Sequence, residues 1–96
     1  MPDSRAAVPA VTTIRLVYLA RLREAFGIAT ERVEIPEGMT TVAALRAWLA
    51  ARGGAWATEL APARAVRIAV NHDLAQPDTP VRPGDEIAVF PPVTGG

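Results

Sequence analysis

The sequence ends in a strand-like apolar segment that runs directly into two prolines and a pair of glycines. The stretch reads Glu86-Ile87-Ala88-Val89-Phe90-Pro91-Pro92-Val93-Thr94-Gly95-Gly96. Its first five residues are rich in β-branched and aromatic side chains, which is typical of a strand. Proline lacks an N–H and pushes the preceding residue into an extended conformation, so a strand cannot continue past Phe90. We therefore predict that the sheet ends at Phe90 and that residues 91–96 continue as a stiff, extended tail.

The rest of the chain supplies the partners of this strand. Strand-like patterns cover residues 14–20, 31–35 and 66–70, and Leu74 starts a brief additional strand. Short helical segments over residues 21–26 and 55–60 precede and follow one longer helix. This order predicts an α+β fold in which one mixed sheet of about four to five strands carries the main helix across one face.

The main helix is the clearest element. Its apolar stripe consists of Val42, Leu45 and Leu49, with Trp48 beside it. Side chains at this spacing share one helix face, so we expect the stripe in the core. Thr40 or Thr41 is expected to cap the start, and Gly53-Gly54 to end the helix in a left-handed conformation. Arg46 and Arg52 are expected to stay in solvent.

The charge and composition exclude several classes of function. Ten basic residues, all of them arginine, balance ten acidic residues, and there is no cysteine. A net charge of zero argues against a nucleic-acid partner and against binding to anionic lipid. Without cysteine the sequence offers no disulfide, thiolate metal site or cysteine nucleophile. The absence of lysine fits GC-rich coding, and it also fits protection of an activated C-terminus from internal amines.

The start of the sequence does not resemble a targeting signal. Residues 1–13 are aperiodic and rich in Ala, Pro and Thr, so we expect a flexible extension. Pro9, Thr12 and Thr13 interrupt the apolar run too early for a signal peptide, and no stretch reaches the roughly 20 apolar residues of a membrane span. Residues 14–96 are then expected to form one domain in the cytoplasm, without a membrane partner.

One face of the predicted sheet is expected to be apolar although no helix covers it. Arg15, Arg67 and Glu86 should point away from the helix, because a buried charge is costly. Strand side chains alternate between faces. The same open face then carries Val17, Leu19, Ala69, Ala88 and Phe90. A contiguous apolar patch of this kind is typical of a protein-docking surface. A bulge or a register shift that hides these residues is the alternative.

The tail suggests that the reactive group is a carboxylate supplied to another protein. The six residues after Phe90 reach at most about 20 Å. Gly95 and Gly96 have no side chains, so they suit a narrow channel. Activation of a carboxylate needs a leaving group such as AMP, and the sequence has no P-loop, no dinucleotide motif and no metal-ligand cluster to catalyse that step.

The remaining candidates are expected to be structural. His72 stands in an Asn-His-Asp turn without a paired acid or nucleophile, so we do not expect it to be catalytic. The acidic residues Asp73, Asp78, Asp85 and Glu86 are more typical of turns than of metal ligands, and we predict no metal site. Trp48 and Trp56 are expected to pack against the core.

From residue 14 to residue 96 the chain resembles the small subunits of molybdopterin synthase, which are ubiquitin-like sulfur carriers of the β-grasp fold. The most specific resemblance covers residues 84–96, from the Gly84-Asp85 turn to the Gly-Gly end. Residues 69–71 and 21–24 are weaker landmarks. The extension over residues 1–13 departs from the usual compact length.

The resemblance implies a cycle in which partners do the chemistry. An E1-like adenylyltransferase would use ATP to adenylate Gly96, and a sulfurtransferase would convert it to a thiocarboxylate. The large synthase subunit would receive the tail, residues 90–95, and catalyse sulfur donation to cyclic pyranopterin monophosphate, within a heterotetramer of two small and two large subunits. The small subunit itself would bind no cofactor. The docking patch is then expected to comprise Val17, Leu19, Arg23, Ala69, Ala88 and Phe90.

Other functions stay open at this point. A related Gly-Gly carrier for thiamine thiazole or another thiolation pathway is the nearest. A binding module that uses the apolar face and never activates its tail is another. A ubiquitin-like modifier that joins lysines of other proteins is a third, and a self-contained enzyme is the least supported.

Overall fold

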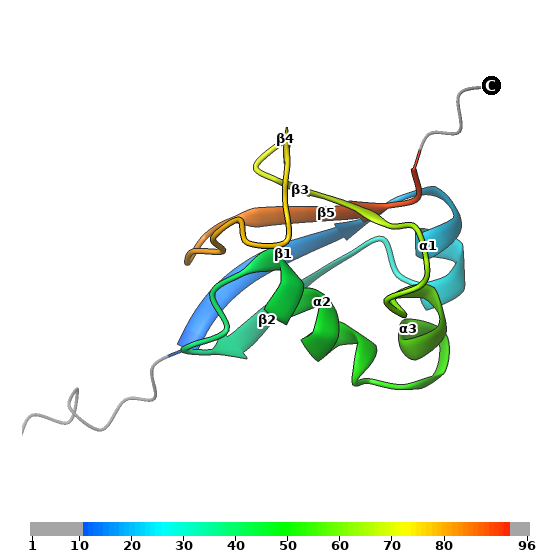
Figure 1. Ribbon diagram of the computed structural model, residues 1–96, viewed down its shortest axis with the longest axis horizontal. Helices are drawn as coiled ribbons and strands as arrows, with labels where there is room; N and C mark the ends of the chain where they lie inside the picture. The colour runs from blue at the N-terminus through cyan, green and yellow to red at the C-terminus, as the bar shows by residue number, and fades with distance from the viewer. Residues whose placement is uncertain (1–10, 93–96) are drawn as a thin grey trace, which may run out of the picture.

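The computed structural model describes residues 11–92, which form one mixed sheet with helices on one of its sides (Figure 1). The strands are β1 (Val11–Tyr18), β2 (Thr30–Pro36), β3 (Arg67–Val70), β4 (Asp73–Leu74) and β5 (Glu86–Phe90). The helices are α1 (Ala20–Phe26), α2 (Val42–Ala50) and α3 (Gly54–Glu59). The predicted α+β fold with a mixed sheet is confirmed, and α2 is the predicted main helix.

The sheet places the first and the last strand side by side at its centre. Its order is β2-β1-β5-β3-β4, with β1 parallel to β5 and the other neighbours antiparallel. The parallel pair needs a long crossover, and the helices lie in that connection. Central strands have neighbours on both sides, so β5 is firmly held up to the residue where the tail begins.

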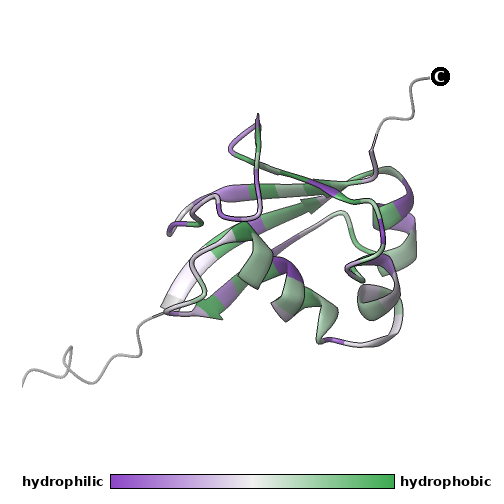
Figure 2. Cartoon of the chain, in the orientation of Figure 1, coloured by the Kyte–Doolittle hydropathy of each residue, from purple (hydrophilic) through white to green (hydrophobic). Residues whose placement is uncertain are grey.

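The core lies between the sheet and the helices. Alternate side chains of the two central strands are fully buried: Ile14, Leu16 and Tyr18 of β1 and Ile87 and Val89 of β5. Figure 2 shows green, hydrophobic bands along these two strands, separated by paler or purple ones. The predicted stripe of α2 packs onto them, since Val42, Leu45 and Leu49 are buried. The sequence periodicity therefore identified the buried helix face correctly.

The first strand begins earlier than the sequence pattern indicated. It starts at Val11 instead of residue 14, and Thr12 and Thr13 pair with Ile35 and Glu34 of β2. Threonine is a good strand former, and cross-strand pairing compensates for the polar pattern of this segment. The predicted extension over residues 1–13 is therefore too long by these three residues, and residues 1–10 lie outside the described part.

The two ends of α2 differ in how well they were predicted. Thr41 is the N-cap, since its hydroxyl accepts a hydrogen bond from the backbone N–H of Ala44 at 3.2 Å. The helix ends at Ala50, and its C-cap Ala51 keeps a right-handed conformation. The predicted glycine stop is wrong, because Gly53, with φ of 81°, is instead the N-cap of α3. A glycine with positive φ therefore links the two helices without terminating the first one.

Arg46 of α2 is also placed differently from the prediction. Its side chain is half-buried and does not lie free in solvent. The guanidinium donates hydrogen bonds to the carbonyl oxygens of Leu60 (3.0 Å), Ala61 (2.7 Å) and Arg64 (2.9 Å). These carbonyls follow α3, where the end of a helix leaves acceptors without intrahelical donors. Arg46 thereby ties the loop before β3 to α2.

Candidate functional site at the end of strand β5

The predicted tail leaves the sheet where the sequence indicated. Strand β5 ends at Phe90, whose backbone is in register with Arg67 of β3. On the other side the N–H of Leu19 donates to the carbonyl of Val89 at 3.1 Å. Pro91 and Pro92 follow outside any strand and are half-buried. Strand β5 is thus paired on both sides up to its last residues, and the two prolines end its hydrogen-bonded ladder after Phe90.

The predicted apolar residues meet on the open face of the sheet. The strand register places Val17, Ala88, Ala69 and Leu74 in one row across β1, β5, β3 and β4. Leu19 and Phe90 follow at the tail end of the same face. This continuous row requires the register without a bulge, so the alternative that hides these residues is wrong. We call Val17, Leu19, Ala69, Leu74, Ala88 and Phe90 the open-face patch.

Exposure within this patch varies, and one member was missed. Leu74 is 58% exposed and Leu19 44% exposed, whereas Ala69, between Ala88 and Leu74 in the row, is only 8% exposed. Leu74 was seen in the sequence as the start of a strand but not as part of the patch. Its cross-strand pairing with Ala69 decides its face, and a two-residue strand offers too little alternation to show this beforehand.

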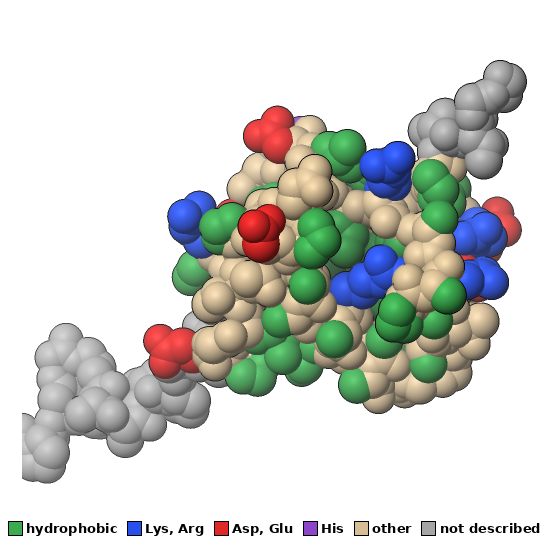
Figure 3. Space-filling view, in the orientation of Figure 1, with side chains coloured by type: hydrophobic (Ala, Val, Ile, Leu, Met, Phe, Trp, Pro, Cys, Tyr) green, Lys and Arg blue, Asp and Glu red, His purple; other side chains and the backbone are tan. Residues whose placement is uncertain are grey.

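The charged residues of the open face lie at both ends of the patch. Arg15 and Glu86 sit opposite each other, with 3.9 Å between guanidinium and carboxylate, at the end away from the tail. Arg67 is exposed beside Phe90. Arg23, the remaining residue of the predicted docking patch, is exposed on α1 and not on the sheet. Figure 3 shows arginine side chains grouped on the side of the molecule where the tail begins.

On the helix side of the sheet, an aromatic cluster packs at the end where the tail begins. Tyr18, which is opposite Val89 in the register, contacts Phe26 of α1 and Trp56 of α3 edge-on, with ring centroids 5.0 and 5.3 Å away. Phe26 and Trp56 stack at 3.8 Å. Aromatic pairs of these geometries stabilise a core beyond their buried area. The two short helices are thereby anchored beneath the point where β5 releases the tail.

Glu31 of β2 joins this cluster by charged hydrogen bonds. It accepts one from the hydroxyl of Tyr18 at 2.6 Å and one from Arg52 at 2.8 Å, while the Arg52 guanidinium lies 4.4 Å from the centre of the Trp56 ring. Arg52 is exposed as predicted, but it is paired and not free. Burial on its own raises the pKa of the Glu31 carboxyl, yet the hydrogen bonds from Arg52 and Tyr18 and the charge of Arg52 together hold that pKa below its ordinary value. Burial, with the hydrogen bond to Glu31 next, raises the pKa of Tyr18.

The side chains outside this region form no further reactive group within residues 11–92. His72 is exposed, and its Nε2 lies 3.9 Å from a Glu86 carboxylate oxygen, so the prediction that it lacks a nearby acid is wrong. Asp85 serves the turn before β5 by accepting from the backbone of Arg82 and from Asn71. The described residues contain no cluster of three or more His, Cys, Asp or Glu suited to a metal ion. None of their helices is long and apolar enough to span a membrane.

The predicted reactive residues follow Pro92 in the sequence. Val93, Thr94, Gly95 and Gly96 lie outside the described residues. The structure therefore presents the base of the tail, formed by Phe90 with the two prolines, beside an apolar face.

Comparison with known proteins agrees with this arrangement. Residues 16–96 match the ThiS family. The chain belongs to the ThiS family. The molybdopterin synthase sulfur carrier subunit of Escherichia coli (strain K12) is 41% identical over 83 residues, which span 86% of this chain and 99% of that protein. The subunit of the same name from Haemophilus influenzae is 35% identical over the same shares of the two chains.

Solved structures support the fold. SAMP1 from Haloferax volcanii superimposes with a TM-score of 0.72 at 27% identity, over 88% of this chain and 99% of that one. The β-grasp fold and the family resemblance inferred from the sequence are thus confirmed. The match reaches Gly96, so the tail belongs to the family's own pattern.

Proposed function

We propose that this chain is a sulfur carrier subunit of molybdopterin synthase, with Gly96 as its sulfur-bearing residue. The observation that carries the proposal is the junction at Phe90, where a firmly paired central strand passes into a proline-stiffened Gly-Gly tail beside the open-face patch. The relatives at 41% and 35% identity are named as such subunits over nearly their whole length.

The chemistry would occur at the C-terminal carboxylate and be catalysed by partners. A carboxylate oxygen of Gly96 attacks the α-phosphorus of ATP, pyrophosphate leaves, and a glycyl adenylate forms. Hydrosulfide supplied by a sulfurtransferase then attacks the glycyl carbonyl carbon, a C–S bond forms as the C–O bond to AMP breaks, and AMP leaves a thiocarboxylate behind. An E1-like adenylyltransferase is the proposed catalyst of the first step, and we propose the cytoplasm, where ATP is available, as the location of the cycle.

The second half of the cycle would use the open-face patch and the tail together. The patch docks on the large subunit, and the residues from Phe90 to Gly95 lead the thiocarboxylate into its active site. The six residues after Phe90 span at most about 20 Å, which limits how far that site lies from the docked sheet. We propose the two-plus-two heterotetramer and sulfur donation to cyclic pyranopterin monophosphate, with the catalytic side chains in the large subunit.

Mass spectrometry of the C-terminal fragment tests the proposal. The chain is incubated with ATP, sulfide and a cognate adenylyltransferase, then cleaved after Glu86. The fragment from Ile87 to Gly96 contains no Met or Trp, so oxidation of those residues cannot imitate the exchange of oxygen for sulfur. We expect one sulfur in place of one oxygen. An unmodified fragment, obtained with an enzyme that charges another carrier, would refute the proposal.

A matched variant separates the carrier from a plain binding module. Removal of Gly95 and Gly96 should abolish sulfur transfer while leaving binding to the large subunit intact, because the patch on residues 17–90 is unchanged. A module that acts only by docking would keep its full activity. A carrier of the thiazole pathway would be charged in the same way but would not copurify with a large synthase subunit.

Similarity to SAMP1 favours a second candidate function. That structure belongs to a protein named small archaeal modifier protein 1, and it matches 88% of this chain. An activated Gly96 could acylate lysines of other proteins by the same adenylate. Isopeptide-linked glycines on cellular proteins, dependent on Gly96 and the adenylyltransferase, would show this activity.

A further inference from the structure

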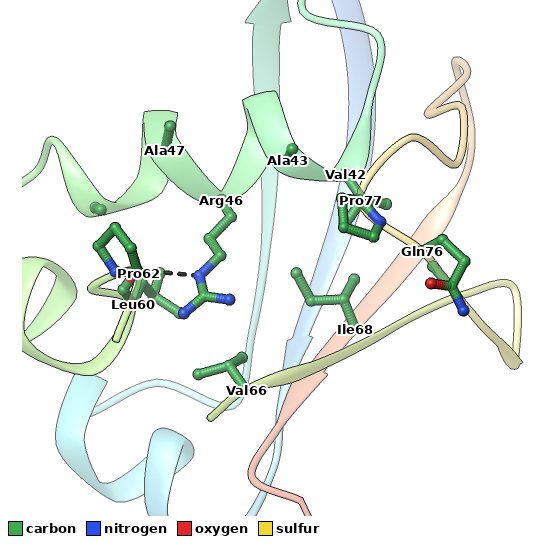
Figure 4. Close-up of a pocket in the computed structure, with 12 residues that line it drawn as sticks. Val42, Ala43, Arg46, Ala47, Leu60, Pro62, Val66, Ile68, Gln76 and Pro77 are labelled. Atoms are coloured by element: carbon green, nitrogen blue, oxygen red, sulfur yellow. Dashed lines mark hydrogen bonds between the residues drawn. The ribbon is translucent and has the colours of Figure 1, made fainter. Parts of the chain in front are cut away.

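A groove on the helix side of the sheet is not used by the proposed sulfur carrier function. It has a volume of about 490 Å³ and lies between α2 and β3 (Figure 4). Its walls are apolar apart from Arg46 and Gln76: Val42, Ala43, Ala47, Ala50, Leu60, Pro62, Val66, Ile68, Ala75 and Pro77. The volume falls in the range of about 300–1,000 Å³ typical of binding sites. The open-face patch lies on the other side of the sheet.

Arg46 gives the groove a single positive charge. Its Nε and Nη2 atoms donate to the three loop carbonyls, whereas Nη1 makes no hydrogen bond to residues 11–92. No acidic residue lines the groove, and no carboxylate of residues 11–92 lies within 4 Å of this guanidinium. Figure 4 shows the side chain reaching down from α2 toward Leu60 and Pro62. A half-buried guanidinium with unused donors favours an incoming carboxylate.

The floor of the groove is an open strand edge. Strand β4 pairs only with Ala69 and Val70, and beyond it a single hydrogen bond from Ala75 reaches Ile68, so the chain before Ile68 has no strand from residues 11–92 beside it on this edge. The register with β5 turns the backbone groups of Val66 and Ile68 away from β5, toward the groove edge. The Ile68 carbonyl accepts from Ala75 at 2.8 Å, and within the described residues Val66 has no backbone partner on this side. Such an edge pairs readily with an extended peptide.

We infer that this groove binds the C-terminal tail of a second copy of the chain. The tail matches it in each respect: Pro91, Pro92 and Val93 are apolar, the prolines keep the segment extended, and Gly96 ends in a carboxylate that suits Arg46 Nη1. Four residues of extended chain span about 13 Å, which is the reach available to Val93–Gly96 from the strand edge toward the guanidinium. None of Phe90, Pro91 and Pro92, the base of the tail, lines the groove, so the contact is head-to-tail, and it withdraws from solvent a tail that carries no sulfur.

Amide chemical shifts of the full-length chain test the inference. In a dilution series, the amides of Ala47, Val66 and Ile68 should shift with concentration, and a chain that lacks residues 91–96 should show no such shift. The synthetic heptapeptide Phe-Pro-Pro-Val-Thr-Gly-Gly should produce the same shifts and saturate. Its C-terminal amide should bind about tenfold more weakly, since the charged hydrogen bond is lost.

Two variants locate the site. Ala47→Glu places a negative charge at an exposed helical position of the groove, where it repels the carboxylate of the peptide. It should weaken binding of the free-acid peptide about tenfold or more. Ala57→Glu, an exposed position of α3 outside the groove, should bind like the parent chain. Absence of binding, equal binding of acid and amide, indifference to Ala47→Glu, or shifts centred on Val17 and Ala88 would each overturn the inference. Thiocarboxylate formation at Gly96 is measured in a separate experiment. Failure of the tail to bind the groove can therefore be distinguished from failure of the sulfur carrier function.

Discussion

At the scale of single residues, Glu31 is the charged group on which the tail end of the sheet depends. Its carboxylate accepts hydrogen bonds from Tyr18 of β1 and from Arg52, which follows α2. Three separate parts of the chain therefore meet at this one group. The side chains of Glu31 and Arg52 are 21% and 28% exposed, and this partial exposure limits how much the pair stabilises the fold. Neither its burial nor its partners follow from the alternating strand pattern, because both partners are distant in sequence.

We predict that Glu31→Gln lowers the free energy of unfolding at pH 7 by about 1 kcal/mol, the size expected for partly exposed charged hydrogen bonds. The folded-state pKa of Glu31 lies below its unfolded value of about 4.3, so its contribution is present above that pH and is lost as pH falls through the folded pKa. Urea unfolding between pH 7 and pH 3 checks this. The two proteins should converge in acid, and a constant difference would contradict the charge-based explanation.

At the scale of elements, α2 shows what sequence patterns predict well and where they fail. The stripe of Val42, Leu45 and Leu49 follows from the helical period alone. The choice between Thr40 and Thr41 as cap depends on which residue is extended just before the first turn. The end is made by local turns, in which the backbone N–H groups of Arg52 and Gly53 donate to the carbonyls of Leu49 and Ala50 at 3.1 Å each. The helix therefore closes in tighter turns before the chain reaches the positive φ of Gly53.

The neighbouring threonines offer a matched test of the cap. Thr41→Ala should lower the free energy of unfolding by about 1 kcal/mol, because the backbone N–H of Ala44 loses its acceptor. Thr40→Ala should change it by less than about 0.5 kcal/mol, since Thr40 is exposed and its carbonyl, which accepts from Val81, is retained. Chemical denaturation of both variants measures the difference. Equal losses would show that the cap contributes nothing specific.

At the scale of the whole molecule, the sequence predicted which face of the sheet is apolar but not how its strands are ordered. The costly burial of Arg15, Arg67 and Glu86 was enough to assign the faces. The row from Val17 to Ala69 exists only because β5 inserts between β1 and β3, and that topology comes from long-range pairing. The tail was recognisable from its prolines and glycines, whereas the groove beneath α2 left no sequence signal because its lining comes from four separate segments.

A substitution in the open-face patch should weaken binding without affecting folding. Ala88 is half-buried at its centre, between Val17 and Ala69, and its side chain points away from the core. Ala88→Glu should therefore leave the fold intact and weaken the complex with the large synthase subunit about 30-fold or more, since a charge at the centre of an interface costs about 2 kcal/mol.

Arg32→Glu is the matched control for this substitution. Arg32 is exposed on the same face but opposite Arg15, outside the patch, and the substitution changes the net charge by two units where Ala88→Glu changes it by one. If general electrostatics governed docking, Arg32→Glu would have the larger effect. If the patch governs docking, calorimetric titration with the large subunit should find Arg32→Glu within a few-fold of the parent chain and Ala88→Glu far weaker. Thermal unfolding of both variants verifies that each is folded, so a loss of binding can be assigned to the surface itself.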